Sequence, residues 1–294
     1  MAWRFALMID PLAADDPRDD VDSGFTEIDP EAPALPVGEL SAQRGDGVFE
    51  SIGVIDGHPQ EVEAHLRRLA HSAELCDLPA PHLGQWRAAV ARAARTCAPG
   101  EAVIKLVLSR GVDGGPAPTA WVMAGTTADF AAARADGIRV ATLDRGYAID
   151  TPARAPWLLL GAKTLSYAVN MAAIREAQRR GADDAVFVSS DGYLLEAPTA
   201  SVVLRRGDSF VTPTPQAGIL HGTTQISLFA HLSAAGYSTS YATVPAADLV
   251  TADAAWLVSS VRLAAPVVSV DGREIAVDAE LTASMNDYLL SPRD

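Results

Sequence analysis

The alternation of apolar and polar residues predicts short strands and amphipathic helices in the first half of the chain. Residues 48–55 are β-branched and apolar, and the pair Asp56-Gly57 that follows is a typical hairpin turn. Residues 61–76 carry apolar side chains at helical spacing, and Pro79 stands shortly after them. A second helix is expected over residues 83–96, and strands are expected over residues 103–108, 121–124 and 138–143.

The second half begins after a proline-containing connection at residues 150–156, whereas residues 10–36 are expected to be irregular. Helices are expected over residues 164–180 and 222–235, each followed by a glycine in the usual capping position. Turns at Asp191-Gly192 and Gly207-Asp208 predict two further hairpins. We therefore predict an α+β protein with a smaller N-terminal domain (residues 1–150), an interdomain connection (151–160) and a larger, hairpin-rich C-terminal domain (161–294).

The amino-acid composition and net charge argue against several classes of partner. The chain has 294 residues, 49% of them hydrophobic, and a formal net charge of −14, which argues against nucleic acid and anionic membranes as partners. No apolar run approaches the ~20 residues that span a bilayer, and no signal peptide is evident, so a cytoplasmic protein is expected. Cys76 and Cys97 have no metal-binding spacing; we expect buried thiols and no metal.

A candidate reactive amine is found at Lys163. It follows the apolar residues 157–160 and Gly161-Ala162, and a lysine in apolar surroundings has a lowered pKa and can form imines. Tyr167 lies four residues later, so a helix would place its hydroxyl on the same face. Taken singly, a solvated lysine at a helix start and a core tyrosine are the ordinary alternatives.

Three further signals suit a phosphorylated pyridine ligand. The glycine-bounded turn at residues 218–222 leads to Thr223 and Thr224 at a helix start, whose free amides favour an anion. Glu196 stands in an apolar setting, where a protonated ring nitrogen would serve as its partner. Arg68 could bind a phosphate through two hydrogen bonds. Ordinary helix caps, a solvated loop glutamate and a surface arginine are the alternatives.

Taken together and in this order, these residues resemble the fold-type-IV pyridoxal-phosphate enzymes, or class IV aminotransferases. The resemblance covers about residues 45–266 and implies the two-domain fold of the D-amino-acid aminotransferases. Its pieces are the segment 45–50 (GDGVFE), His65 with Arg68 and Leu69, Lys163 with Tyr167, the segments 196–201 and 218–224, and Ser259-Ser260 before Pro266.

The resemblance implies a role for each matching residue. Lys163 would form a Schiff base with pyridoxal 5'-phosphate and move the proton at the substrate carbon. Glu196 would pair with the ring nitrogen, and Tyr167 would lie near the phenolic oxygen. The remaining cofactor-binding residues would be Arg68, Gly222, Thr223, Thr224 and Ser260 around the phosphate and Leu220 against the ring. A homodimer is implied as well. Gln225 departs from the arginine that the family often has at this position.

Within the family the chain looks most like the aminodeoxychorismate lyases, which produce 4-aminobenzoate and pyruvate for folate synthesis. Residues 104–111 and 259–262 carry this likeness, and residues 112–119 lack the Arg-x-His pair of D-amino-acid aminotransferases. The small amino substrate has two carboxylates, for which Lys105, Arg110 and Arg262 are candidate partners. The alternatives are a D-amino-acid or branched-chain aminotransferase and, more remotely, a non-enzymatic module that binds a phosphate ligand.

Overall fold

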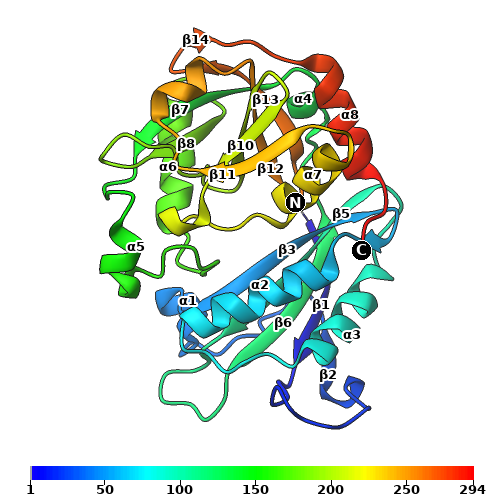
Figure 1. The fold of residues 1–294 in the computed structure, drawn as a ribbon. Helices are drawn as coiled ribbons and strands as arrows, with labels where there is room; N and C mark the ends of the chain where they lie inside the picture. The colour runs from blue at the N-terminus through cyan, green and yellow to red at the C-terminus, as the bar shows by residue number, and fades with distance from the viewer. Residues whose placement is uncertain (1) are drawn as a thin grey trace. The chain divides into compact units, whose positions relative to one another are not determined.

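The computed structural model describes residues 2–294 and divides into two compact units, each built around one β-sheet (Figure 1). Unit 1 comprises Met1–Ala128, Ala162–Tyr167 and Pro292–Asp294, and unit 2 comprises Asp129–Gly161 and Ala168–Ser291. This division differs from the expected one, which placed residues 1–150 in the first domain and residues 151–160 in the connection. Strand β7 (Ile138–Asp144) pairs with strands β13 and β8 of the second sheet, which assigns it to unit 2.

Unit 1 contains a six-stranded antiparallel sheet in the order β2-β1-β6-β5-β3-β4. Its strands are β1 (Ala2–Ile9), β2 (Phe25–Ile28), β3 (Gly47–Ile55), β4 (His58–Pro59), β5 (Glu101–Ser109) and β6 (Thr119–Thr126). The helices are α1 (Leu40–Arg44), α2 (Val62–Leu75) and α3 (Leu83–Ala94), with a 3-10 turn at Asp22–Gly24. The predicted hairpin after β3 and both longer helices are confirmed. Strands β1 and β2 were not expected.

Helices α2 and α3 lie along one face of this sheet (Figure 1). Side chains alternate between the two faces of a strand, so every second residue of β3 and β5 meets the helices. Ile52 and Ile104 are fully buried in this way, as are Leu66 and Leu69 on α2. Burying large aliphatic side chains is worth about 1.5–3 kcal/mol each, which makes this layer the core of unit 1.

Unit 2 contains an eight-stranded mixed sheet in the order β11-β10-β9-β12-β13-β7-β8, with β14 beside β13. Besides β7, its strands are β8 (Asp184–Val188), β9 (Ser201–Arg206), β10 (Ser209–Pro213), β11 (Ser238–Ala242), β12 (Ala254–Ser259), β13 (Leu263–Val270) and β14 (Arg273–Glu274). The helices are α4 (Ala131–Ala135), α5 (Thr151–Arg154), α6 (Ala168–Arg179), α7 (Thr223–Ala234) and α8 (Ala279–Leu290); 3-10 turns lie at Pro156–Leu158, Pro215–Ala217 and Ala246–Val250. The hairpin at Gly207-Asp208 and the α7 helix are confirmed.

Two buried clusters stabilise unit 2. Phe210 and Trp256 belong to the cluster that includes Leu228 of α7 and Leu289 of α8. A second cluster, which includes Val140 and Leu257, contains residues from β7 to β13. No helix within residues 2–294 is long and apolar enough to cross a membrane. Of the two free cysteines, both in unit 1, Cys76 is buried as expected, but Cys97 is only half-buried.

The helix predicted from residue 164 begins later, at Ala168. Residues 162–167 are instead held against β3: the Phe49 N–H donates to the Lys163 carbonyl at 2.9 Å, and the Leu165 N–H donates to the Gly47 carbonyl at 2.8 Å. Gly47 permits this close approach, because a Cβ atom there would lie 2.8 Å from Leu165 Cδ1. The prediction that Lys163 and Tyr167 share a helix face is therefore wrong.

A buried ion pair joins α2 to β3. Glu50 has no exposed surface, and it accepts hydrogen bonds at 2.7 Å from Arg68 Nε, Arg68 Nη2 and His65 Nδ1. Burial alone would raise the pKa of the Glu50 carboxyl, but the Arg68 guanidinium and His65 hold it well below its usual range. Burial lowers the pKa of His65 and so disfavours its charged form. Because a carboxylate oxygen accepts, Nδ1 is the donor in the contact with Glu50.

Replacing Glu50 with glutamine should lower the free energy of unfolding by about 3–5 kcal/mol at neutral pH, because Arg68 then loses its buried counter-charge. Urea denaturation followed by circular dichroism measures this loss. The matched control is Glu63→Gln, since Glu63 and its partner Arg87 are about half exposed and such pairs contribute about 1 kcal/mol or less. Equal losses in the two variants would contradict the assigned role of Glu50.

The pH dependence of stability should follow from the lowered pKa of His65. A folded-state pKa below the unfolded value of about 6.5 contributes stability that is complete above pH ~6.5 and declines as the pH falls toward the lower folded value. His65→Asn removes this titration. The free energy of unfolding should therefore fall less between pH 7 and pH 5 in His65→Asn than in the wild type, and identical slopes would refute the assignment.

Candidate active site

Lys163 presents its amine to two aromatic rings. Its Nζ atom lies 4.5 Å from the ring centroid of Phe49 and 5.8 Å from that of Tyr167, and these two rings meet edge to face. The backbone is held on both sides, because the Lys163 N–H donates to Ser72 Oγ at 3.1 Å and its carbonyl accepts from Phe49. The amine thus has the partly apolar setting that the sequence predicted, on a backbone fixed by β3 and α2.

Lys105 approaches the same ring. Its Nζ atom lies 4.6 Å from the Phe49 centroid, and burial lowers its pKa. The chain contains only two lysines, and both contact Phe49. Within the part of the chain that the structure describes, no carboxylate forms an ion pair with Lys105. A half-buried cation without a protein counter-ion is suited to bind an anionic ligand.

The two candidate arginines in unit 1 have different surroundings. Arg68 uses one edge of its guanidinium to hold Glu50, and its side chain is only 12% exposed. Arg110 donates to Asp46 Oδ2 at 2.8 Å and to the carbonyls of Cys76 and Asp77 at the end of α2. The prediction that Arg110 binds substrate is not supported, because its guanidinium is used to cap a helix.

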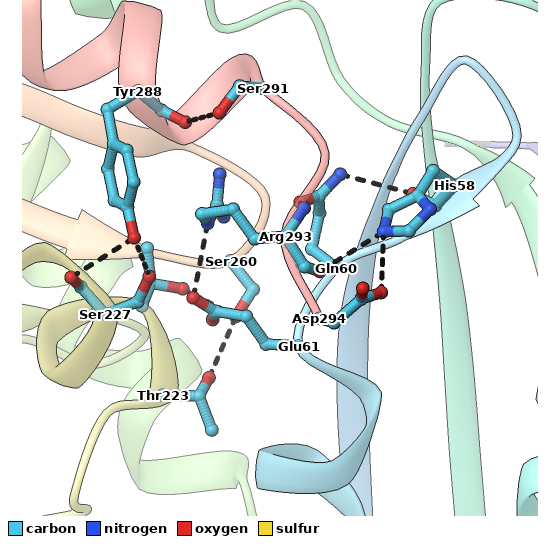
Figure 2. A network of polar contacts seen from close by, with 11 residues as sticks. His58, Gln60, Glu61, Thr223, Ser227, Ser260, Tyr288, Ser291, Arg293 and Asp294 are labelled. Atoms are coloured by element: carbon cyan, nitrogen blue, oxygen red, sulfur yellow. Dashed lines mark hydrogen bonds and ion pairs between the residues drawn. The ribbon is translucent and has the colours of Figure 1, made fainter. Parts of the chain in front are cut away.

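The predicted phosphate-binding residues of unit 2 come together at the start of α7. The Oγ1 atoms of Thr223 and Thr224 lie 3.4 and 2.9 Å from Ser260 Oγ, so that three hydroxyls meet at a helix start; the Thr223–Ser260 contact is drawn in Figure 2. Gly222, the N-cap residue, offers no side chain to the helix amides. A Cβ atom there would lie 2.4 Å from Ser201 Oγ, so any larger residue would require the Ser201 hydroxyl to move. Hydroxyls and free amides fit a phosphate.

Glu196 is anchored beside this cluster. Its Oε2 atom accepts a hydrogen bond of 3.1 Å from the Leu220 N–H, and its backbone carbonyl accepts one from Phe187. The predicted carboxylate and the residue expected to cover the ring are therefore in contact. Gln225, which replaces the family's arginine, is buried and donates to the Tyr241 hydroxyl at 3.2 Å.

Arg262 does not belong to this group of side chains. Its Nη2 atom lies 2.7 Å from Asp184 Oδ2, Asp184 is 2% exposed, and the guanidinium lies against the Phe130 ring. Losing the partner of a buried carboxylate is costly, so Arg262 is held in a structural role and its predicted contact with substrate is not supported.

Sequence reasoning gave no individual role to Phe49 or Ser72. Phe49 appeared only as part of the segment 45–50. A signal was present, because Phe49 and Glu50 are neighbours on a strand and their side chains must therefore face opposite sides of the sheet. Ser72 gave no signal, because its contact with Lys163 spans 91 residues. Among residues 2–294, no group of three or more His, Cys, Asp or Glu side chains could hold a metal ion.

Comparisons with known proteins identify the family of this chain. A family model for amino-transferase class IV matches residues 47–270. The bifunctional aminodeoxychorismate lyase / D-amino acid transaminase of Mycobacterium tuberculosis is 47% identical over 84% of this chain and 90% of its own length.

Solved structures agree on the fold. The fold IV-transaminase CpuTA1 from Curtobacterium pusillum aligns with a TM-score of 0.92 at 50% identity, over 97% of each chain. A hypothetical aminotransferase from M. tuberculosis aligns with a TM-score of 0.87 in two forms. Its PLP-bound form is 44% identical over 97% of this chain and 98% of that one, and its alpha-ketoglutarate and PMP bound form is 46% identical over 90% and 96%.

The hydroxyl cluster at a helix start, the anchored carboxylate and the lysine amine are the chemical groups that pyridoxal phosphate needs, and this is the cofactor of the protein. The predicted fold class is confirmed, with two sheets in a mixed α and β chain. The chain belongs to the class IV aminotransferases, the fold-type-IV pyridoxal-phosphate enzymes.

Proposed function

We propose that this protein is an aminodeoxychorismate lyase that uses pyridoxal phosphate to convert 4-amino-4-deoxychorismate into 4-aminobenzoate and pyruvate. The observation that carries the proposal is the pair of lysine amines on the Phe49 ring, one suited to an imine and the other to a carboxylate. The name of the 47%-identical mycobacterial relative, which includes this lyase activity, supports the choice.

The proposed cofactor contacts follow the residues described above. As the resemblance implies, Lys163 would hold the cofactor at its aldehyde carbon, Glu196 would pair with the ring nitrogen, and Tyr167 would lie near the phenolic oxygen. Leu220 would pack against the ring. The phosphate would be held by the guanidinium, hydroxyl and amide groups of Arg68, Thr223, Thr224 and Ser260, with Gly222 in the same turn as the two threonines. When bound, pyridoxal phosphate supplies an electron sink for the carbon attached to the substrate amine.

Lys163 then acts as the general base. Its Nζ atom takes the proton from the substrate carbon that bears the amine, which requires a neutral amine. The neighbouring ether C–O bond breaks with its electron pair on the oxygen, and the six-membered ring becomes aromatic. The three-carbon side chain leaves as the enolate of pyruvate, which takes up one proton to give pyruvate. We assign Lys105 to one of the two substrate carboxylates, because no described carboxylate of the protein pairs with it.

A second activity is favoured by the comparisons. The mycobacterial relative's name also includes D-amino acid transaminase, and one related structure holds alpha-ketoglutarate with PMP. In a transamination, Lys163 would take the proton from the amino acid's carbon and hold it for return, and the cofactor would supply the group that keeps the amine until a keto acid accepts it. We propose D-amino acids as secondary substrates, in a homodimeric enzyme as the resemblance implies.

The identity of the reactive amine is testable because the chain has two lysines. Borohydride reduction of the cofactor-loaded protein followed by peptide mass spectrometry should place the adduct on Lys163. Lys163→Ala should lose the adduct and the yellow colour, and its kcat should fall by about 100- to 10,000-fold. Lys105→Met is the matched control and should keep both adduct and colour. An adduct on Lys105 in the wild type would overturn the assignment.

The role of Lys105 is tested by substrate affinity. Lys105→Gln should raise the KM for aminodeoxychorismate by about 10- to 100-fold, since a hydrogen bond to a charged group contributes about 1.5–3 kcal/mol. Its cofactor absorbance should not change. Arg139→Gln, at an exposed ion pair of unit 2, serves as the control with an unchanged KM. An unchanged KM in Lys105→Gln would remove Lys105 from the substrate site.

The two reactions are separated by their need for a keto acid. Purified enzyme should release pyruvate from aminodeoxychorismate with no keto acid added, and should transaminate D-alanine only when alpha-ketoglutarate is present. Transamination without any pyruvate release from aminodeoxychorismate would reject the lyase and leave the second activity.

A further inference from the structure

Arg293 is bound to the two residues that precede α2. Its N–H donates to Gln60 Oε1 at 2.9 Å, and its carbonyl accepts from the Glu61 N–H at 2.9 Å. Its Nε atom lies 3.3 Å from Glu61 Oε1, with the two side chains 8% and 6% exposed (Figure 2). His58 Nε2 also contacts the Arg293 carbonyl, at 3.2 Å. These contacts are all within unit 1, because Pro292–Asp294 belongs to it.

Glu61 has an unfavourable backbone conformation. Its φ of 55° and ψ of 40° lie in the left-handed region, which residues with a Cβ atom rarely adopt unless their surroundings hold them there. Glu61 is also the N-cap of α2, and its side chain makes no capping hydrogen bond. The backbone and side-chain bonds to Arg293 therefore hold a strained residue at the start of this helix.

Helix α2 carries three side chains that order the candidate site. The Glu61 carbonyl accepts the His65 N–H at 3.1 Å, which forms the first turn of the helix. His65 and Arg68 then bind Glu50, and Ser72 accepts the Lys163 N–H. Each of these hydrogen bonds tolerates only small displacements. A shift of the first turn would therefore displace the side chains further along α2 and weaken their hydrogen bonds.

We propose that Arg293 is a positioning residue for the cofactor site. By holding Glu61 in its left-handed conformation, Arg293 sets the start of α2 and thereby the position of the Arg68 guanidinium. The inference rests on the proposed function in one respect, namely that Arg68 binds the cofactor phosphate. It gives a purpose to a buried ion pair whose residues are not among the proposed cofactor contacts.

The first test is Arg293→Ala in the full-length protein. Amides in the first turn of α2 should exchange with deuterium faster, because Glu61 loses its side-chain partner and its strained conformation is held less firmly. The dissociation constant for pyridoxal phosphate, measured by titration, should rise on the order of ten-fold, about 1.4 kcal/mol. Asp294→Ala is the control, since the Asp294 side chain is 99% exposed, and it should change neither quantity.

Second-site variants distinguish backbone strain from general packing. Glu61→Gly in the Arg293→Ala background should restore slow exchange and bring the dissociation constant to within about three-fold of the wild type, because glycine adopts this conformation freely. Glu61→Ala in the same background removes the unpaired carboxylate but keeps the Cβ atom, so it should recover less. Equal recovery by alanine, or no recovery by glycine, would overturn the proposed mechanism.

Arg68→Ala, measured in parallel, separates the two possible failures. If Arg68→Ala leaves cofactor binding unchanged, the phosphate assignment in the proposed function is wrong. If Arg68→Ala weakens cofactor binding while Arg293→Ala does not, the positioning role of Arg293 is wrong and the phosphate assignment stands. Unchanged amide exchange in Arg293→Ala would also refute the inference.

Discussion

The Glu50 carboxylate has no exposed surface, and its negative charge must be met inside the protein. His65 and Arg68 meet it from positions three residues apart, which places both on the same face of α2. One strand residue therefore determines which face of the helix meets the sheet. Because Ser72 lies further along the same helix and holds the Lys163 backbone, the position of the Lys163 amine depends on this buried charge as well.

The alternation of side chains along β3 places the buried ion pair and the lysine amines on opposite faces of the sheet. Glu50 and Phe49 are consecutive on β3, so their side chains project to opposite faces of the sheet. One face holds the buried ion pair, and the other holds the ring that both lysines contact. Arginine cannot replace Lys163 in a reaction that needs a neutral amine, because a guanidinium keeps its proton. The many arginines instead form ion pairs, such as those with Asp184 and Glu61.

Local sequence patterns correctly predicted the helices and hairpins that form through contacts between residues close in sequence. The hairpin after β3, the helices α2, α3 and α7, and the hairpin between β9 and β10 agree with their predicted ranges within a few residues. Residues 164–167 were mispredicted as helix because the conformation of this segment depends on pairing with β3, more than 100 residues earlier. Strand β1 was missed for a related reason: its pairing partner β6 lies far along the chain, and a short apolar patch alone does not indicate a strand.

The same distinction applies to the site. Thr223, Thr224 and Ser260 could be expected to meet, because the resemblance assigned all three to one phosphate, and their hydroxyls do converge. Arg110 and Arg262 could not be judged from their own positions, since Asp46 and Asp184, which bind them, are distant in sequence. In a chain with a net charge of −14, an arginine readily finds an acidic partner within the fold. Lys105 has no such partner among the described residues and is half-buried beside an aromatic ring. Its charged form is therefore stabilised most by an anion that the protein does not supply, which is the physical reason to assign it to the substrate.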